Sequence, residues 1–303
     1  QNLGNHCVVE DIRRADWSSF RTPFWWHASP PCTTASKANP NAGETLLDIA
    51  LAAAIRRGIS ELRPRRFSLE NVWGYTTYFS FRRIQETLQA EGYAFSHWHL
   101  DAANYGVPQN RKRLILVASL DHQPHRPIAT HSKHAAPASQ LGMFDDAIRP
   151  WRGWFDAVKH RIEEFTPSKW ANWQVPRLPA EWAELQEPFL VGGGNTGFAG
   201  AAEGNGVRYA DEPMLTIRAG RSSIRAFIMH GSNSGADGDR FRYDTEPRAR
   251  ISGRVVQLSV DALADLQDFP PNYRLPTTKT KACDIIGNAV PPGLMRAVIA
   301  ANR

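Results

Sequence analysis

Cysteine is scarce in this sequence: its 303 residues include only Cys7, Cys32 and Cys283. An odd set at wide spacing does not make a disulfide framework, and no Cys-x-x-Cys pair offers a zinc site. A chain without disulfides is typical of a reducing compartment. We therefore expect a cytoplasmic protein that binds no metal.

Long apolar runs are also missing. No stretch of about 18 apolar residues could span a membrane, and no signal peptide is visible. The composition, 42% hydrophobic and 22% charged, is that of an ordinary globular protein with room for a large and a smaller domain. The net charge of +6 is a mild excess, so by itself it favours a nucleic-acid partner only modestly.

The first part of the chain, residues 1–120, alternates between two kinds of pattern. Short apolar runs typical of strands alternate with longer segments of helical periodicity. The expected strands are 24–29, 67–72, 94–100 and 113–119, and the expected helices are 45–61 and 78–91. This alternation predicts an α/β domain with a mostly parallel sheet.

The remainder of the chain changes character three times. Residues 121–149 are rich in His, Pro, Ala and Ser and are typical of a linker, whereas 150–253 hold most of the tryptophans and predict a smaller, loop-rich domain. The glycine tract at 192–206 has no lysine at phosphate-loop spacing, which disfavours a phosphate site there. Residues 258–267 are helical again, and after a loop the segment 285–303 has a Pro-Pro pair near the start of a last helix.

Two candidate reactive side chains follow the first two strands. Residues 29–32 read Ser-Pro-Pro-Cys, so Cys32 lies just beyond a strand end, where α/β sheets place their ligands. Taken alone, Cys32 is equally well explained as an inert buried cysteine. Glu70 ends the next strand, and adjacent parallel strands would bring both side chains to one edge of the sheet. By itself such a carboxylate is more often a helix-cap partner.

Three further stretches stand out. Residues 105–113 read Tyr-Gly-Val-Pro-Gln-Asn-Arg-Lys-Arg, and we expect Arg111 and Arg113 to alternate, one reaching the site and the other packing or binding phosphate. Near the other end, 266–270 read Leu-Gln-Asp-Phe-Pro and 287–292 read Gly-Asn-Ala-Val-Pro-Pro. Each stretch alone is compatible with an ordinary basic strand edge or a helix–turn–helix.

In this order, the five motifs resemble those of the cytosine-C5 DNA methyltransferase family. The resemblance covers about residues 10–120 and 254–303. It implies a Rossmann-like α/β sheet with a smaller, loop-rich target-recognition domain. The implied division is a catalytic domain over 1–120, a linker over 121–149, the target-recognition region over 150–253 and a return to the catalytic domain over 254–303.

The resemblance also implies a mechanism. Cys32 would add to C6 of a cytosine that has swung out of the duplex. Glu70, protonated or sharing a proton, would bond to the base at N3, and Arg111 would hold the base, with Arg113 as the other catalytic arginine. S-adenosylmethionine would supply the methyl group. The implied cofactor-binding residues are Asp11, Pro30, Asn288 and Val290.

The expected partner is double-stranded DNA. The segment after Cys32 would close over the DNA, although Thr33 stands where many members of the family have glutamine. Arginines of the target-recognition region would read the major groove. The DNA-binding candidates are Ser36, Lys37, Gln109, Arg218, Arg221, Arg225, Arg240 and Arg242.

One part of the family pattern is not found. The Phe-x-Gly-x-Gly motif that wraps the methionine end of the cofactor is absent, while residues 10–12, Glu-Asp-Ile, resemble the motif that follows it. Three explanations stay open: the sequence is trimmed, a second polypeptide supplies the motif, or the protein is a degenerate homologue. Otherwise we expect a monomer.

The resemblance predicts a DNA cytosine-C5 methyltransferase that serves restriction–modification or phage DNA protection in a bacterial or phage-infected cell. The alternative is a non-catalytic DNA-binding subunit or a degenerate homologue without cofactor binding. A tRNA cytosine methyltransferase of the same fold is a third hypothesis. The long segment between residues 113 and 266 disfavours it, because the known tRNA enzymes have a short one.

Overall fold

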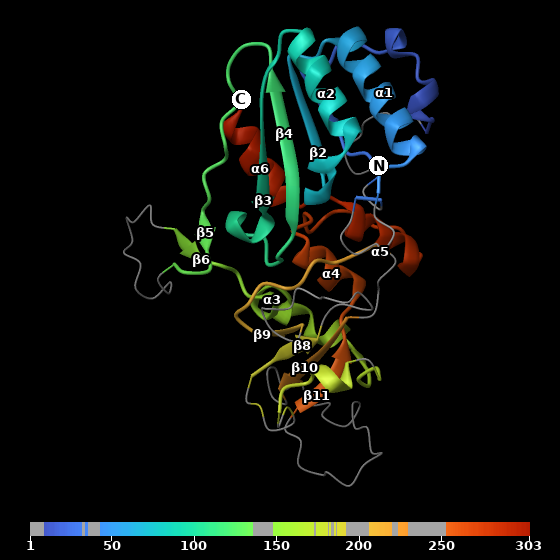
Figure 1. Ribbon diagram of the computed structural model, residues 1–303. Coiled ribbons are helices and arrows are strands. Elements are labelled where there is room, and N and C mark those ends of the chain that lie inside the picture. Colours follow the sequence, from blue (N-terminus) through green and yellow to red (C-terminus); the bar gives the residue numbers. More distant parts are fainter. Residues whose placement is uncertain are drawn as a thin grey trace. The chain divides into compact units, whose positions relative to one another are not determined.

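The computed structural model describes residues 9–31, 34–35, 43–135, 148–172, 174–180, 182, 185, 187–191, 206–219, 224–229 and 253–303. The chain forms two compact units (Figure 1). Unit 1 comprises residues 1–101, 112–128 and 295–303, and unit 2 comprises 102–111 and 129–294. Neither unit is continuous in sequence, so each must be described from segments that lie far apart along the chain.

Unit 1 is built on a four-stranded sheet in the order β1-β2-β4-β3. Its strands are β1 (Trp25–Ala28), β2 (Arg66–Asn71), β3 (Ala94–Asp101) and β4 (Lys112–Ser119). The four expected strands are confirmed, but the expectation of a mostly parallel sheet is wrong for the described strands. Only β1 and β2 run parallel, whereas β4 is antiparallel to both neighbours. The reason is the connection from Asp101 to Lys112, which is too short for a parallel crossover.

Helices α1 (Leu46–Leu62) and α2 (Phe79–Ala90) lie side by side on one face of this sheet (Figure 1). Both confirm the expected helical segments. Buried apolar side chains of α1 and α2 pack on those of β2 and β4, which makes one continuous core. The largest members of this core include Ile55, Ile59, Phe67, Leu69 and Ile84, each of them almost fully buried. Burial of each such side chain stabilises the folded state by about 1.5–3 kcal/mol. This core holds β2, the strand that carries Glu70, in place.

The end of the chain reaches the buried arginine at the start of β2. The Nε atom of Arg66 donates to the backbone oxygen of Asn302, 236 positions away, at 2.8 Å. Asn302 also exchanges two hydrogen bonds with the backbone of His125, at 2.8 and 3.0 Å. Residues 295–303, which form most of α6 (Pro292–Ala301), therefore belong to unit 1.

Two helices form the last part of the chain. Helix α5 (Lys279–Asn288) ends before Ala289, whose backbone is extended, and α6 begins at Pro292. The expected last helix, with the Pro-Pro pair near its start, is therefore confirmed as α6. A proline disfavours the helical conformation of the residue before it and cannot donate the hydrogen bond of a helix interior, so the pair of prolines separates the two helices.

Unit 2 contains a five-stranded antiparallel sheet in the order β7-β11-β10-β8-β9. Its strands are β7 (Thr166–Pro167), β8 (Phe189–Val191), β9 (Val207–Tyr209), β10 (Arg225–Met229) and β11 (Gly253–Gln257). The segment expected to be a linker contributes a short parallel pair, β5 (His131–Ser132) and β6 (Arg149–Pro150). The region expected to be loop-rich thus has a regular sheet among its described residues.

The core of unit 2 explains where the units divide. Helices α3 (Trp154–Val158), α4 (Val260–Leu266) and α5 bury apolar side chains together with residues of β10 and β11. Because these helices complete the core of unit 2, the chain returns to unit 1 at residue 295.

Candidate functional site

A buried ion pair lies at the carboxyl end of β2. Arg113 Nε is 2.7 Å from Glu70 Oε1, and the two side chains are only 8% and 6% exposed. Ser29, directly after β1, donates its hydroxyl to Glu70 Oε2 at 2.5 Å. The carboxylate is therefore held from both sides, by a cation on β4 and by a hydroxyl that follows β1.

The strand register explains why these side chains meet. Glu70 lies opposite Ile115 in the antiparallel pairing of β2 and β4. Arg113 lies two residues from Ile115, so it shares the face of Ile115 and reaches Glu70 diagonally. Residues two apart on a strand point to the same face of the sheet. The expectation that Arg111 and Arg113 point to opposite faces therefore does not follow from strand geometry. Arg111 instead precedes β4, which begins at Lys112.

The segment in front of Cys32 is tied to the same strand. Asn71, the residue after Glu70, donates its side-chain amide to the backbone oxygen of Pro30 at 3.2 Å. The side-chain oxygen of Asn71 accepts the backbone N–H of Val72 at 2.8 Å, which orients the amide. Cys32 and Thr33 lie outside the described residues.

Of the three cysteines, only Cys283 lies among the described residues. It is fully buried in the core of unit 2, and this burial raises the pKa of its thiol. A thiol with a raised pKa holds little thiolate at neutral pH and is a poor nucleophile. The structure therefore leaves Cys32 and Cys7 as the candidates for a reactive thiol.

A polar cluster that the sequence did not reveal lies beside Glu70. Ser68 Oγ accepts a hydrogen bond from Trp25 Nε1 and contacts His27 Nδ1, both at 2.8 Å. Desolvation lowers the pKa of His27, and the Glu70 carboxylate opposes this shift. Ser29 was likewise missed as a site residue, although its place directly before Pro-Pro-Cys was a usable signal.

Arg111 and Gln109 occupy structural positions in unit 2. Arg111 is 1% exposed and donates to the backbone oxygens of Ile217 (2.8 Å) and Gly287 (2.7 Å). Gln109 is fully buried and bonds Gln267 and the backbone of Ile217. These contacts differ from the base contact expected of Arg111 and the DNA contact expected of Gln109. Arg111 instead bonds to the Gly-Asn-Ala-Val-Pro-Pro segment, and Gln109 bonds to the Leu-Gln-Asp-Phe-Pro segment.

The glycine of the Gly-Asn-Ala-Val-Pro-Pro segment has a packing reason. A Cβ atom on Gly287 would lie 2.1 Å from the backbone nitrogen of Ala219 and 2.4 Å from the backbone carbon of Arg218. Only glycine allows the two backbones to approach this closely. The expected cofactor residues that follow, Asn288 and Val290, lie at the end of α5 and just beyond it, exposed and half-buried respectively.

The expected DNA contacts divide into three groups. Arg225 is half-buried and bonds Ser168 and Gln174, whereas Arg218 is half-buried in the segment before β10. Gln109 is buried, as described above. The remaining candidates lie outside the described residues: Ser36, Lys37, Arg221, Arg240 and Arg242.

A cavity of about 240 Å³ lies along β1 in unit 1. Its lining is mainly apolar: Ile12, Trp26, His27, Ala28, Ser29, Pro30, Pro31, Leu51 and Ile55. Asp11 precedes Ile12 in the chain, and hydrogen bonds from Arg13 lower the pKa of its carboxyl to about 2, so it is ionised at neutral pH. An apolar slot suits a flat heterocycle. This fits the adenosyl part of S-adenosylmethionine but is too small for the whole molecule.

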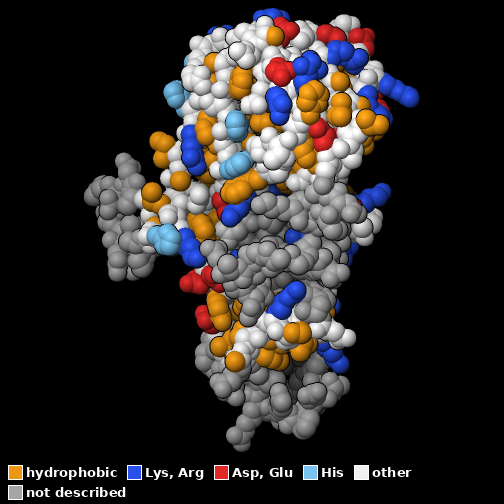
Figure 2. Space-filling model, in the orientation of Figure 1, with side chains coloured by type: hydrophobic (Ala, Val, Ile, Leu, Met, Phe, Trp, Pro, Cys, Tyr) orange, Lys and Arg blue, Asp and Glu red, His pale blue; other side chains and the backbone are white. Residues whose placement is uncertain are grey.

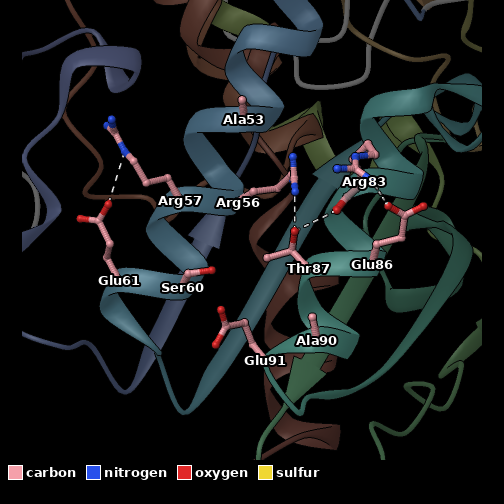
Figure 3. A pocket seen from close by; sticks show the side chains of 10 residues that line it. All are labelled: Ala53, Arg56, Arg57, Ser60, Glu61, Arg83, Glu86, Thr87, Ala90 and Glu91. Atoms are coloured by element: carbon pink, nitrogen blue, oxygen red, sulfur yellow. Dashed lines mark hydrogen bonds and ion pairs between the residues drawn. The ribbon is translucent and has the colours of Figure 1, made fainter.

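A second hollow, a groove of about 640 Å³ between α1 and α2, has a different chemistry (Figure 3). Its charged groups bond to neighbours within the groove: Arg83 pairs with Glu86, and Arg56 donates to Thr87 at 2.7 Å. Figure 2 shows acidic and basic side chains interspersed over these helices. The groove therefore presents no charge of one sign that would select a ligand.

Within the ranges given above, no three His, Cys, Asp or Glu side chains gather closely enough to bind a metal ion. Among the same residues, no helix has the length and apolar character needed to cross a membrane.

The fold and the site together define a Rossmann-like α/β protein with a buried carboxylate–arginine pair at the carboxyl end of a strand. A sequence profile of the C-5 cytosine-specific DNA methylases matches residues 1–302, and the chain belongs to that family. The family resemblance seen in the five motifs is thereby confirmed.

Individual relatives are bacterial Type II methyltransferases. M.XorII of Xanthomonas oryzae pv. oryzae is 26% identical over 253 residues, which cover 80% of this chain and 59% of that protein. M.NlaIV of Neisseria lactamica is 35% identical over 149 residues, covering 46% of this chain and 34% of the relative. The chain thus spans between one third and three fifths of the length of these two relatives.

Solved structures agree on the fold. The crystal structure of the S. pombe Dnmt2 methyltransferase superposes with a TM-score of 0.56 at 13% identity, covering 99% of this chain and 84% of that one. At this identity the likeness concerns the fold, a Rossmann-like α/β sheet.

Proposed function

We propose that this chain carries the catalytic centre of a DNA cytosine-C5 methyltransferase, with Cys32 as nucleophile and double-stranded DNA as substrate. The observation that carries the proposal is the buried Glu70–Arg113 pair with Ser29 on its other side, next to the segment that leads to Cys32. Family membership supports the same reaction.

The chemistry assigns each group a task. As the Cys32 thiolate bonds to C6, the C5–C6 π electrons shift to C4–C5 and the C4–N3 electrons take up a proton at N3, which Glu70 supplies after it has itself taken up a proton from solvent. Arg113 and Ser29 hold the Glu70 carboxyl in place for this transfer. C5 becomes nucleophilic through this addition and bonds to the methyl group, while N3 returns its proton to Glu70. A water molecule then takes up the C5 proton, the C5–C6 double bond is restored and the C6–S bond breaks, which releases Cys32 as thiolate.

S-adenosylmethionine is the proposed cofactor. When bound, it supplies an electrophilic methyl group. The cavity along β1 would hold its adenosyl part against Ile12 and Pro30. Asp11, Asn288 and Val290 stay proposed cofactor contacts.

Labelled S-adenosylmethionine and duplex DNA test the reaction directly. The chain should transfer label to cytosine, and Cys32→Ala and Glu70→Gln should not. A duplex with 5-fluorocytosine at the target should trap a covalent adduct, because its C5 has no proton to lose. The same adduct from Cys32→Ser would contradict the assignment of the nucleophile.

Calorimetry with S-adenosylhomocysteine separates the alternatives. Binding of both S-adenosylhomocysteine and DNA without adduct formation would refute the proposed reaction. DNA binding without binding of S-adenosylhomocysteine would instead indicate a non-catalytic DNA-binding subunit. We assign the biological role to restriction–modification or phage DNA protection, because the relatives described above are Type II methyltransferases.

A further inference from the structure

The chain on the far side of Cys32 is fastened by a second set of hydrogen bonds. Thr34 donates its hydroxyl to Asp48 Oδ1 at 3.0 Å. Asp48, although a carboxylate, is 5% exposed and lies in the first turn of α1. Residue 34 is therefore tied to the start of a helix that belongs to the core of unit 1.

Asp48 makes more hydrogen bonds than helix capping requires. In a capping box the third helical residue needs only to accept the backbone N–H of the cap residue. Asp48 Oδ2 does this for Thr45 at 2.8 Å and also accepts the Thr45 hydroxyl at 2.7 Å. The bond from Thr34 to Oδ1 is additional: it satisfies the second oxygen of this buried carboxylate, and it fixes residue 34.

Neighbouring contacts close the segment that follows Thr34. Gly43 donates its backbone N–H to the Thr34 oxygen at 3.0 Å, so residues 34 and 43 meet. Glu44 accepts the N–H groups of Phe79 and Ser80, at 2.9 and 2.7 Å, at the start of α2. The two ends of the segment 34–44 are thus anchored on α1 and α2.

Ala35 is anchored on the strand that carries Glu70. It is 5% exposed, and its backbone oxygen lies 2.3 Å from where a Cβ atom on Gly74 would be. Gly74 comes four residues after Glu70 in the same chain segment. The chain on both sides of Cys32 therefore rests on the Glu70 segment: Pro30 through Asn71, and Ala35 through Gly74.

We infer that Thr34 is a positioning residue for the Cys32 nucleophile, acting through its hydrogen bond to Asp48. Pro30 lies two residues before Cys32 in the sequence, and Thr34 lies two residues after it. Both residues are fixed on elements joined to Glu70, so we expect the Thr34 hydrogen bond to affect how readily Cys32 adds to the base. This inference rests on the proposed function.

The test is Thr34→Val, which keeps the shape of the side chain and removes the hydroxyl. We expect the rate of adduct formation with 5-fluorocytosine DNA, in the presence of S-adenosylmethionine, to fall by about 10- to 100-fold, since small misplacement of a reacting group has effects of this size. The dissociation constant for the duplex should stay within about twofold, because Thr34 is placed here to act on the thiol and not on DNA. Thr34→Ser keeps the hydroxyl and should restore most of the rate.

Thr77→Val is the matched control, since it removes an exposed threonine hydroxyl that bonds only the backbone oxygen of Gly74, at 2.9 Å. Thermal unfolding of each variant shows whether a loss of rate is merely a loss of fold. Equal adduct rates for Thr34→Val and the unaltered chain would overturn the inference alone. If Thr34→Ser were as slow as Thr34→Val, the hydroxyl would not be the cause, and the inference would also fail. No adduct with the unaltered chain would overturn both the inference and the proposed function.

Discussion

Arg113 and Glu70 form a 2.7 Å ion pair in which neither side chain is more than 8% exposed. Removing one member of such a pair leaves the other charge buried without a partner, which costs about 3–5 kcal/mol. The pair therefore couples the proposed chemistry to the stability of unit 1.

Glu70→Gln should abolish chemistry and also lower the stability of the fold. The amide keeps the shape, and its one oxygen can still accept from Arg113, but it has no acidic proton to give to N3. We expect methyl transfer to fall by about 10²–10⁴-fold, the usual contribution of a general acid. The free energy of unfolding, measured with denaturant, should fall in Glu70→Gln and in Arg113→Met alike, because each substitution leaves one buried charge without its partner. Unchanged stability in both variants would show that the buried charges cost nothing.

Gly74→Ala should disturb the base of the segment after Cys32. Its new Cβ would meet the backbone oxygen of Ala35 at 2.3 Å, and a backbone atom cannot rotate aside. We expect a loss of about 1–3 kcal/mol in unfolding free energy, typical of overpacking. Gly43→Ala is the control, because nothing lies within 4 Å of its added carbon. Similar losses from both variants would show that glycine flexibility, and not the contact with Ala35, is what matters.

Arg111→Met should destabilise unit 2. The substitution leaves the backbone oxygens of Ile217 and Gly287 without their buried donor, at about 1–3 kcal/mol for each unsatisfied group. Arg152→Met is the control: Arg152 also donates to a backbone oxygen, that of Gly106, but it is exposed. Denaturant unfolding measures both. Loss of methyl transfer in Arg111→Met without loss of stability would instead support the base contact that the sequence suggested.

The stability of unit 1 should depend on Asp121 at low pH. Hydrogen bonds from Arg65 and then Arg66 lower the pKa of the Asp121 carboxyl from 3.8 to about 2. A group with a lowered pKa in the folded state stabilises the fold above its unfolded pKa and loses this contribution as pH falls through the folded value. Asp121→Asn should therefore flatten the decline of unfolding free energy between about pH 4 and pH 2, which denaturant titrations at several pH values can measure. An unchanged pH profile would show that the ion pairs persist in the unfolded chain or contribute nothing.

The strands and helices of residues 1–120 were accessible from the sequence because hydrophobic periodicity and capping residues are local signals. Thr45 and Asp48, for example, are recognisable as a capping box three residues apart. Strand direction was not accessible in this way. It depended on how the short connection after Asp101 is accommodated, and no pattern within β3 or β4 encodes it.

The candidate site was predictable in its members but not in its pairings. Glu70 and Arg113 were identified from motifs, yet the motif Gln-x-Arg-x-Arg does not show which arginine reaches the carboxylate. Which arginine reaches Glu70 depends on where β4 begins. Arg113 lies within β4 and Arg111 precedes it, so the direction of the Arg111 side chain is not set by the strand. Thr34 and Asp48 were missed because neither is unusual alone, and their bond joins residues 14 positions apart.

The hydrogen bond between Arg66 and Asn302 has a consequence for how the protein is made. A ribosome delivers residue 66 long before residue 302, and nearly all of unit 2 emerges between them. The four strands of unit 1 are made early, but the Arg66 guanidinium lacks its backbone acceptor until α6 arrives. At about 5–20 residues per second this interval lasts many seconds. The order of synthesis therefore allows unit 2 to be completed before unit 1 receives its last segment.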